Sequence, residues 1–368
     1  MTVWRNTFGR LLVVLCLPVA ALAADLRTLR IYNFAEYSAE DTIRSFEKET
    51  GIKVQYDTYN TNEVLLSRLA IGNSGYDIVV LSADFAKSLI DSGSFQRIDR
   101  TKLTNWSNLD PDILHQMALF DPGNQYLVNW LWGYTTIAIN ATRLQAALGG
   151  LAMPEDPWRL VFDPAYASRA KSCGIGVVDS ASTIIPLALR FMGLPPFSLK
   201  PAVYAEVAEL LRQVRPYIAH FSADDNSERL AEGKLCVVVG HSGDLAQARK
   251  RAQQRNKAEV VEVVIRNAGA IQFFHSMAIP HDAANPDAAH RFINYILRPE
   301  VHAALTNKLL HANPNKASRR YISAEVASDP VVYPDPAQLR GMLVPEPLPD
   351  NIRRLQIRTF TGFKFGWY

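Results

Sequence analysis

The sequence predicts an α/β fold in which helices flank a doubly wound sheet. Short apolar runs typical of buried strands recur along the chain, amphipathic helical patterns separate them, and turn residues mark each change from one to the other. The first part of the chain therefore has the order strand, helix, strand, helix, strand. This order favours a largely parallel sheet with helices on both faces.

The first α/β unit lies between residues 29 and 92. We predict its strands at residues 29–33 (LRIYN), 52–56 (IKVQY) and 77–81 (DIVVL) from their apolar or alternating patterns. A capping-box pattern at residues 38–41 (SAED) opens the first helix, which Gly51 ends. Residues 60–63 (NTNE) cap a second helix that ends near Gly72, and a third helix covers residues 84–92.

A second α/β unit begins near residue 134. Strand patterns occur at residues 134–140 (YTTIAIN), 174–178 (GIGVV), 235–239 (LCVVV) and 272–279, and a helical pattern occurs at residues 204–214. Residues 240–244 (GHSGD) turn the strand before them into a helix. Asn285 and Pro286 open a helix over residues 287–297, with Asn as the N-cap, and another helix follows Pro299 and runs to about residue 310.

The predicted strand ends locate a candidate binding site. In doubly wound sheets, ligands bind outside the carboxyl ends of the strands. This rule points to residues 34–37 after the first strand and to residues 82–84 after the third. Tyr37 and Ser82 are therefore candidate ligand contacts, whereas Asp84 also suits the N-cap of its helix.

The first 23 residues have the features of an export signal. Arg5 and Arg10 precede an apolar run at residues 11–20, and residues 21–23 (ALA) form the small-x-small pattern that a signal peptidase cleaves. The run is far shorter than the ~20 apolar residues of a membrane-spanning helix. We expect cleavage after Ala23 and a periplasmic location; the alternative is a buried N-terminal helix.

Charge and cysteine content further narrow the class of protein and its expected partners. The net charge is +3, and the charged residues are interspersed without a basic stripe, so nucleic acid is not an expected partner. Cys16 lies in the segment that we expect to be removed. The two remaining cysteines, Cys173 and Cys236, most simply form one disulfide in an exported protein. A metal or redox pair is not expected, because neither cysteine stands in a CxxC spacing.

Seven motifs resemble those of the putrescine- and spermidine-binding proteins of ABC transporters. They are residues 31–37 (IYNFAEY), 46–51 (FEKETG), 76–82 (YDIVVLS), 171–174 (KSCG), 240–244 (GHSGD), 298–301 (RPEV) and 312–316 (ANPNK), and they follow one register through nearly the whole mature chain. The resemblance implies a two-lobed periplasmic binding protein fold with a hinge of two crossings, which closes on ligand. It implies an N-terminal lobe of residues 24–134 and 270–306, and a C-terminal lobe of residues 135–269 and 307–368.

The resemblance also implies which residues contact the ligand. In the family, a diamine lies between aromatic faces, and carboxylates accept its ammonium ends. We therefore expect ligand contacts from Phe34, Glu36, Tyr37, Ser82, Asp84, Thr183, His241, Asp244, Phe274, His275 and His311. Phe273 belongs equally well in the core, because alternation along a strand turns it away from Phe274. Asp244 has a second interpretation, as a residue that only caps its own helix.

Several of these positions depart from the family pattern. Phe34 and His241 stand where the family has tryptophan, His275 and Thr183 replace acids, His311 replaces a tyrosine, and Asp84 replaces a neutral residue. Because two amine-holding acids are absent, the ligand is either a polyamine or related amine, or a different amine or zwitterion such as an ω-amino acid.

The three histidines allow three interpretations. They line the pocket as neutral hydrogen-bonding groups, or they favour a ligand carboxylate when protonated, or they form a three-histidine metal site. No HExxH or GxSxG motif supports an enzyme. We therefore expect a monomeric binding protein without cofactor, metal or catalysis, which delivers a small amine to an inner-membrane ABC permease. A metal-dependent or histidine-based enzyme on the same fold is the alternative, and a periplasmic sensor domain is a further partner compatible with transport.

Overall fold

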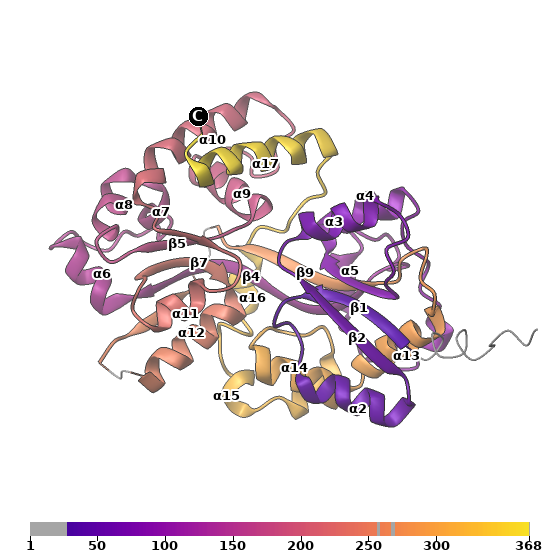
Figure 1. Ribbon diagram of the computed structural model, residues 1–368. Helices are drawn as coiled ribbons and strands as arrows, with labels where there is room; N and C mark the ends of the chain where they lie inside the picture. The colour runs from indigo at the N-terminus through magenta and orange to yellow at the C-terminus, as the bar shows by residue number, and fades with distance from the viewer. Residues whose placement is uncertain (1–27, 256–257, 266–268, 368) are drawn as a thin grey trace, which may run out of the picture.

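The computed structural model describes residues 28–255, 258–265 and 269–367, and its described part has α/β architecture (Figure 1). The predicted signal peptide lies outside the described residues. The strands are β1 (Thr28–Phe34), β2 (Lys53–Tyr59), β3 (Ile78–Ser82), β4 (Val128–Asn140), β5 (Ile175–Val178), β6 (His220–Ser222), β7 (Val237–His241), β8 (Val261–Val264) and β9 (Ile271–Ala278).

Helices alternate with these strands along most of the chain. The α-helices are α2 (Glu40–Thr50), α3 (Asn62–Ala70), α4 (Ala83–Asp91), α5 (Pro111–Met117), α6 (Ala141–Leu148), α7 (Arg159–Phe162), α8 (Pro164–Ala170), α9 (Ala181–Phe191), α10 (Ala202–Val214), α11 (Asn226–Ala231), α12 (Ser242–Arg255), α13 (Pro286–Ile296), α14 (Pro299–Leu309), α15 (Ala324–Ala327), α16 (Pro336–Arg340) and α17 (Asp350–Phe365). Short 3-10 helices cover Arg100–Lys102, Trp106–Asn108, Arg215–Tyr217 and Lys316–Tyr321.

All the described strands belong to one nine-stranded sheet, in the order β2-β1-β3-β9-β4-β7-β5-β6, with β8 paired to β4. The sequence predicts a separate doubly wound sheet in each lobe. The structure has a set of parallel strands in each half and joins the two sets through β4 and β9, which pair antiparallel along most of β9. These two long strands provide the two predicted crossings between the halves, and a third follows later in the chain. The chain passes between the halves again after α14, on its way to α17.

The strand directions bring the two halves of the site together. β3 lies antiparallel to β9 and ends where Ser82 pairs with His275. β7 lies antiparallel to β4 and ends where His241 pairs with Thr135. Because His275 also pairs with Leu131 of β4, both carboxyl ends approach the middle of the same strand. The sheet therefore directs the carboxyl ends of the parallel strands in both halves toward one central region.

Helices cover both faces of each half. In the first half, Ile78 and Val80 face a core with α2, α13 and α14, whereas Val79 faces a core with α3, α4 and α5. In the second half, Val237 faces a core with α7 to α10 and α17, whereas Val238 packs against α11 and α12. Alternate residues of one strand enter opposite cores, which explains why these parallel strands are apolar throughout.

Three predicted side-chain caps are not formed. No side chain caps α2, whose N-cap is Ala39, and the hydroxyl of Ser38 instead bonds to Tyr56. No side chain caps α3, where Asn60 donates to Asp224 and Asn62 accepts from the Ser82 amide. Asn285 occupies the N-cap of α13, but its side-chain amide donates to the Thr28 carbonyl oxygen. In each case a partner distant in sequence replaces the local cap.

The predicted disulfide between Cys173 and Cys236 is present, with the two Cα atoms 5.5 Å apart. It ties the end of α8 to the start of β7. Within the described part of the chain, no helix combines the length and apolar character needed to cross a membrane.

Candidate ligand-binding site

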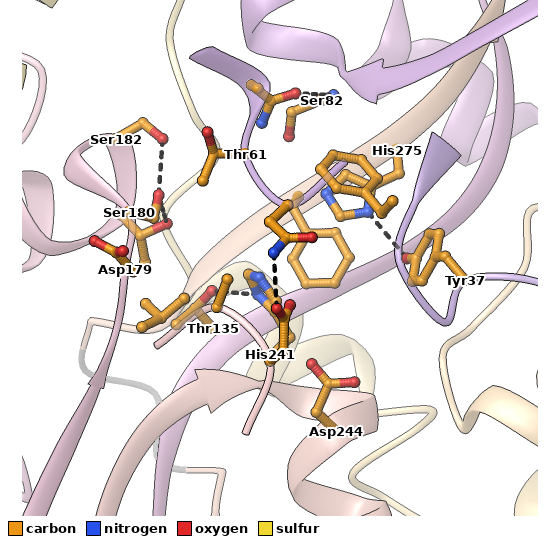
Figure 2. A pocket seen from close by; sticks show the side chains of 18 of the residues that line it. Tyr37, Thr61, Ser82, Thr135, Asp179, Ser180, Ser182, His241, Asp244 and His275 are labelled. Atoms are coloured by element: carbon orange, nitrogen blue, oxygen red, sulfur yellow. Dashed lines mark hydrogen bonds between the residues drawn. The ribbon is translucent and has the colours of Figure 1, made fainter. Parts of the chain in front are cut away.

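A cavity of about 840 Å³ lies where the strand ends of the two halves meet (Figure 2). Residues that follow β1, β3, β5, β6 and β7 line it, together with side chains of β4, β9 and α17. Its lining includes all the predicted contact residues except Phe274. The rule that ligands bind at the carboxyl ends of strands therefore located the region of this cavity.

The turn after β1 supplies four lining residues of the site, which are Ala35, Glu36, Tyr37 and Ser38. Glu36 adopts φ 55°, in the left-handed region that non-glycine residues rarely occupy. Such a backbone costs about 1–3 kcal/mol and is found most often at functional sites. The turn leaves Glu36 exposed, while Tyr37 beside it is buried.

An aromatic stack forms one wall of the cavity. The His275 ring lies between Phe34 and Phe273, with ring centroids 4.5 Å from each and interplanar angles of 28° and 25°. The Tyr37 hydroxyl is 3.0 Å from His275 Nδ1 and fixes the ring by a hydrogen bond. Burial lowers the pKa of His275 well below its usual value, and the neighbouring His241 and His311 act in the same direction. His275 is therefore a neutral member of the wall.

Phe274 is not part of the cavity, and its predicted contact with ligand is wrong. It lies in the core of the first half, 6.1 Å from Phe120 between ring centroids. Phe273 lines the cavity instead. The reason is the two-residue period of a strand, which places Phe273 and His275 on one face of β9 and Phe274 on the other.

His241, Asp244 and His311 form a polar group at one side of the cavity. Thr135 Oγ1 lies 3.0 Å from His241 Nδ1, and His311 Nε2 lies 3.5 Å from Asp244 Oδ1. Burial lowers the pKa of His241, although Asp244 partly opposes this. Burial alone would raise the pKa of Asp244, but the hydrogen bond from His311 and the charges of His311 and His241 lower it. Asp244 is therefore an anion beside two histidines.

Carboxylates gather around Asp244 from both halves of the molecule. Burial raises the pKa of Asp224, and the negative charges of Glu36, Asp244, Asp225 and Asp179 raise it further. Asp225 is paired with Arg229 and His220, at 2.7 Å in each case. The cavity consequently has a cluster of carboxyl groups at this side, which suits a cationic group.

A second region of the cavity is rich in hydroxyl groups. Figure 2 shows Thr61, Ser82, Ser180 and Ser182 on the side of the cavity away from Asp244. Ser180 Oγ lies 3.1 Å from Ser182 Oγ and 3.0 Å from Thr183 Oγ1, so the three hydroxyls form a chain. The predicted contact Thr183 belongs to this chain.

The acids of the hydroxyl region have cationic neighbours on α17. Asp179 Oδ2 lies 2.5 Å from Lys364 Nζ. Burial raises the pKa of Asp84, while the charge of Arg353 acts in the opposite direction. Arg353 also donates to the Asp84 carbonyl oxygen at 3.5 Å and stacks on the Phe85 ring, 4.2 Å from its centroid. Its guanidinium thus lies against the start of α4.

The arrangement gives no geometric support to a metal centre. Among the described residues, no group of three His, Cys, Asp or Glu side chains could hold a metal ion. The ring centroids of His241 and His275 are 6.2 Å apart, with the rings nearly perpendicular.

Sequence reasoning missed several lining residues. Asp224 and Asp225 follow β6, which has only three residues and no recognisable strand pattern. Had β6 been identified, the strand-end rule would have pointed to both. Arg353 lines the cavity from α17, and Lys364 of the same helix pairs with the lining residue Asp179. The sequence analysis did not predict this helix. The amphipathic pattern of that helix was the available signal, but its approach to the cavity depends on tertiary packing.

A two-lobed α/β molecule with a carboxylate-rich, aromatic-lined cavity at the meeting point of its strand ends defines a solute-binding protein. Comparisons with known proteins support this class of protein. Residues 41–333 match the family described as bacterial extracellular solute-binding protein. The chain belongs to this family.

The similar proteins are transport binding proteins. The chain is 38% identical to the putrescine-binding periplasmic protein SpuD of Pseudomonas aeruginosa, over 98% of this chain and 99% of SpuD. It is 39% identical to the putrescine-binding periplasmic protein PotF of Escherichia coli, over 96% of this chain and 95% of PotF. A solved structure of the spermidine/putrescine ABC transporter substrate-binding protein PotD from Streptococcus pneumoniae matches with TM-score 0.72 and 26% identity, over 92% of this chain and 98% of that one. The protein is thus a bacterial extracellular solute-binding protein and not an enzyme.

Proposed function

We propose that the protein captures a putrescine-like amine in the cavity between its lobes and delivers it to an inner-membrane ABC permease. The observation that carries this proposal is the group of three carboxylates, from Glu36, Asp224 and Asp244, beside an aromatic wall. An ammonium group gains charge-assisted hydrogen bonds from the former and cation–π contacts from the latter. The names of the relatives support an amine as the ligand.

We propose that the ligand contacts all the predicted residues except Phe274. Phe273, which lines the cavity, is proposed as a contact in place of Phe274. The lobes are proposed as residues 24–134 with 270–306, and residues 135–269 with 307–368. The separate cores of the two halves support this division. Leu309 and Ala312 pack in the cores of the first half, which favours a last passage between lobes slightly later, after residue 312.

The protein is proposed to act as a periplasmic monomer after removal of residues 1–23. The export signal in the sequence supports the location. Size-exclusion chromatography with light scattering and the N-terminal sequence of the exported protein test these two points. A dimer, or an uncleaved N-terminus, would contradict them.

Isothermal titration calorimetry tests the proposed ligand class. Refolded, ligand-free protein is titrated with primary amines of four to six carbons, including putrescine, and with neutral sugars and anionic dicarboxylates as controls. At least one amine should bind with a micromolar or lower Kd, and the controls should give no heat of binding. Binding of a control class, with no amine bound, would overturn the proposal.

A further inference from the structure

We infer that His311 is a positioning residue, which orients the Asp244 carboxylate toward the ligand, and that Gly243 provides the space that the His311 ring requires. The inference rests on the proposed amine-binding function and states how one carboxylate of the site is held. It follows from the packing of the His311 ring between α12 and the turn after β1.

The Asp244 carboxylate has one partner that can hold it. Asp244 lies in the first turn of α12 and lines the cavity (Figure 2). His311 Nε2 lies 3.5 Å from Asp244 Oδ1, and within the described part of the chain this is the only ion-pair contact of Asp244. The charge of Arg251 also acts on Asp244, but the Arg251 guanidinium is paired with Glu228 at 3.0 Å. His311 is therefore the side chain that can orient this carboxylate.

The exposure of the two side chains separates their roles. The Asp244 side chain is 41% exposed, whereas the His311 side chain is 2% exposed. Because a carboxylate only accepts hydrogen bonds, the ring bonds to Asp244 through a proton on Nε2. The ring itself offers a ligand almost no surface. His311 therefore contributes to binding mainly through Asp244, whose negative charge it directs toward an ammonium group.

Gly243, directly before Asp244, allows the close approach of the His311 ring. A Cβ atom at Gly243 would lie 2.6 Å from each of three ring atoms, Cγ, Cδ2 and Cε1. Tyr37 and Phe273 also contact the ring, with centroids 5.4 and 5.7 Å from its own. A larger residue at position 243 would therefore displace the ring from its place beside the carboxylate.

The backbone on both sides of His311 is fixed as well. Leu310 ends α14 with φ 55°, and its amide donates to the Thr306 carbonyl oxygen at 2.8 Å. On the other side, the Trp132 amide of β4 donates to the Ala312 carbonyl oxygen at 2.8 Å. A non-glycine residue rarely adopts the left-handed conformation of Leu310, and such strain is found most often at functional sites. The ring is thus presented from a fixed stretch of chain.

Two substitutions at His311 test the positioning role by calorimetry at pH 7.5, with putrescine as the probe and cadaverine as a second probe. His311→Phe keeps a ring but has no donor, so the Kd should rise at least about tenfold, as expected for loss of a hydrogen bond to a charged group. His311→Gln restores an N–H donor within reach of Asp244. It should bind at least about fivefold more tightly than His311→Phe.

A third substitution tests the role of Gly243. Gly243→Ala should raise the Kd at least about tenfold in the wild-type background, because the added methyl group displaces the ring. In the His311→Gln background, where no ring meets the methyl group, the same substitution should change the Kd by less than about threefold. Alanine favours a helix more than glycine does, so α12 should still form. Thermal melting checks the fold of each variant.

The outcomes separate the inference from the proposed function. If His311→Phe binds the diamines as tightly as His311→Gln, or more tightly, the ring acts as a direct contact and the inference is overturned, while the amine-binding function stands. An equal effect of Gly243→Ala in both backgrounds overturns it as well. If neither diamine binds the wild-type protein, the inference is overturned, and the proposed function fails with it only when the other amines also give no heat of binding.

Discussion

At the scale of single residues, the same side-chain type has different roles according to its surroundings. His275 is held between two phenylalanine rings, whereas His311 lies beside Asp244. His302 lies outside the cavity, fully buried, with Nε2 2.6 Å from the Trp130 carbonyl oxygen. Because a carbonyl only accepts, His302 must carry its proton on Nε2.

Asp244→Asn should weaken amine binding by about 1–3 kcal/mol, or about 5- to 150-fold, because it removes a charge-assisted hydrogen bond. The asparagine can still occupy the first turn of α12, so the melting temperature should change little. Calorimetry with the tightest amine measures the effect. Asp350→Asn is the matched control, since Asp350 lies in the first turn of α17 and does not line the cavity. Unchanged affinity in Asp244→Asn would restrict Asp244 to a structural role.

Acidification from pH 7 to pH 5 should lower the free energy of unfolding, in part through His302. Burial lowers the pKa of His302 to about 4. The unfolded chain takes up this proton near pH ~6.5, while the folded protein resists it, so stability is lost as the pH falls through this window. The contribution of His302 at pH 5 is about 2 kcal/mol.

His302→Gln should reduce this loss, because glutamine can donate to Trp130 and does not titrate. Urea unfolding at pH 7 and pH 5 measures the difference for wild type and variant. The same substitution at His115, which is exposed on α5, is the control. An identical loss of stability in His302→Gln and wild type would show that this histidine does not contribute.

At the scale of elements, the segment around Gly174 shows how a short motif shapes a junction. Gly174 has φ 92°, and a Cβ there would lie 2.9 Å from the Lys234 carbonyl oxygen, so glycine is required. Its carbonyl oxygen accepts from the Cys236 amide at 2.9 Å. The close backbone approach aligns β5 with β7 and brings Cys173 to Cys236.

Removal of the disulfide should destabilise the protein without impairing ligand binding. The cysteines are 63 residues apart, and cross-linking a loop of this size stabilises a fold by up to about 4 kcal/mol in the chain-entropy model. Urea unfolding of Cys173→Ser/Cys236→Ser should show a loss of about 2–4 kcal/mol. Neither cysteine lines the cavity, so amine affinity should stay at the wild-type value. Two free thiols in the native exported protein, detected by alkylation and intact mass, would contradict the bond itself.

At the scale of the whole molecule, the cavity lies between two halves that meet at a few polar contacts. Asn60, after β2, donates to Asp224 Oδ2 at 2.9 Å from across the cavity. On α17, Arg353 contacts the start of α4 in the other half. The carboxylates of Glu36 and Asp224 repel one another across the same gap. A bound ammonium group would offset this repulsion and favour the closed arrangement.

Ligand should therefore reduce the radius of gyration measured by small-angle scattering, and Asn60→Asp should oppose this change. The substitution removes the contact with Asp224 and places a like charge there, which should weaken binding by about 1 kcal/mol, or about fivefold. Exchanging the partners, in Asn60→Asp/Asp224→Asn, should restore closure by reforming the hydrogen bond. A scattering profile that does not respond to a tight ligand would contradict closure of the cavity.

Local patterns in the sequence determined much of the fold. Strand and helix periodicity placed β1, β2, β3, β5 and most of β7 and β9, because buried strands and amphipathic helices are set by apolar spacing within a few residues. The strand-end rule then located Tyr37 and Ser82 at the cavity. The disulfide followed from the number of cysteines in an exported chain.

Only the tertiary structure decided the contacts between distant segments. It joined the halves through β4 and β9, placed His275 between Phe34 and Phe273, and brought Lys364 to Asp179 across 185 residues. It also replaced the predicted caps of α2 and α3 with distant partners. The physical reason is that periodicity fixes which face of an element is buried, whereas the partner that covers that face depends on packing the whole chain. The charge of the cavity is set by such partners, and it therefore emerges only in the folded molecule.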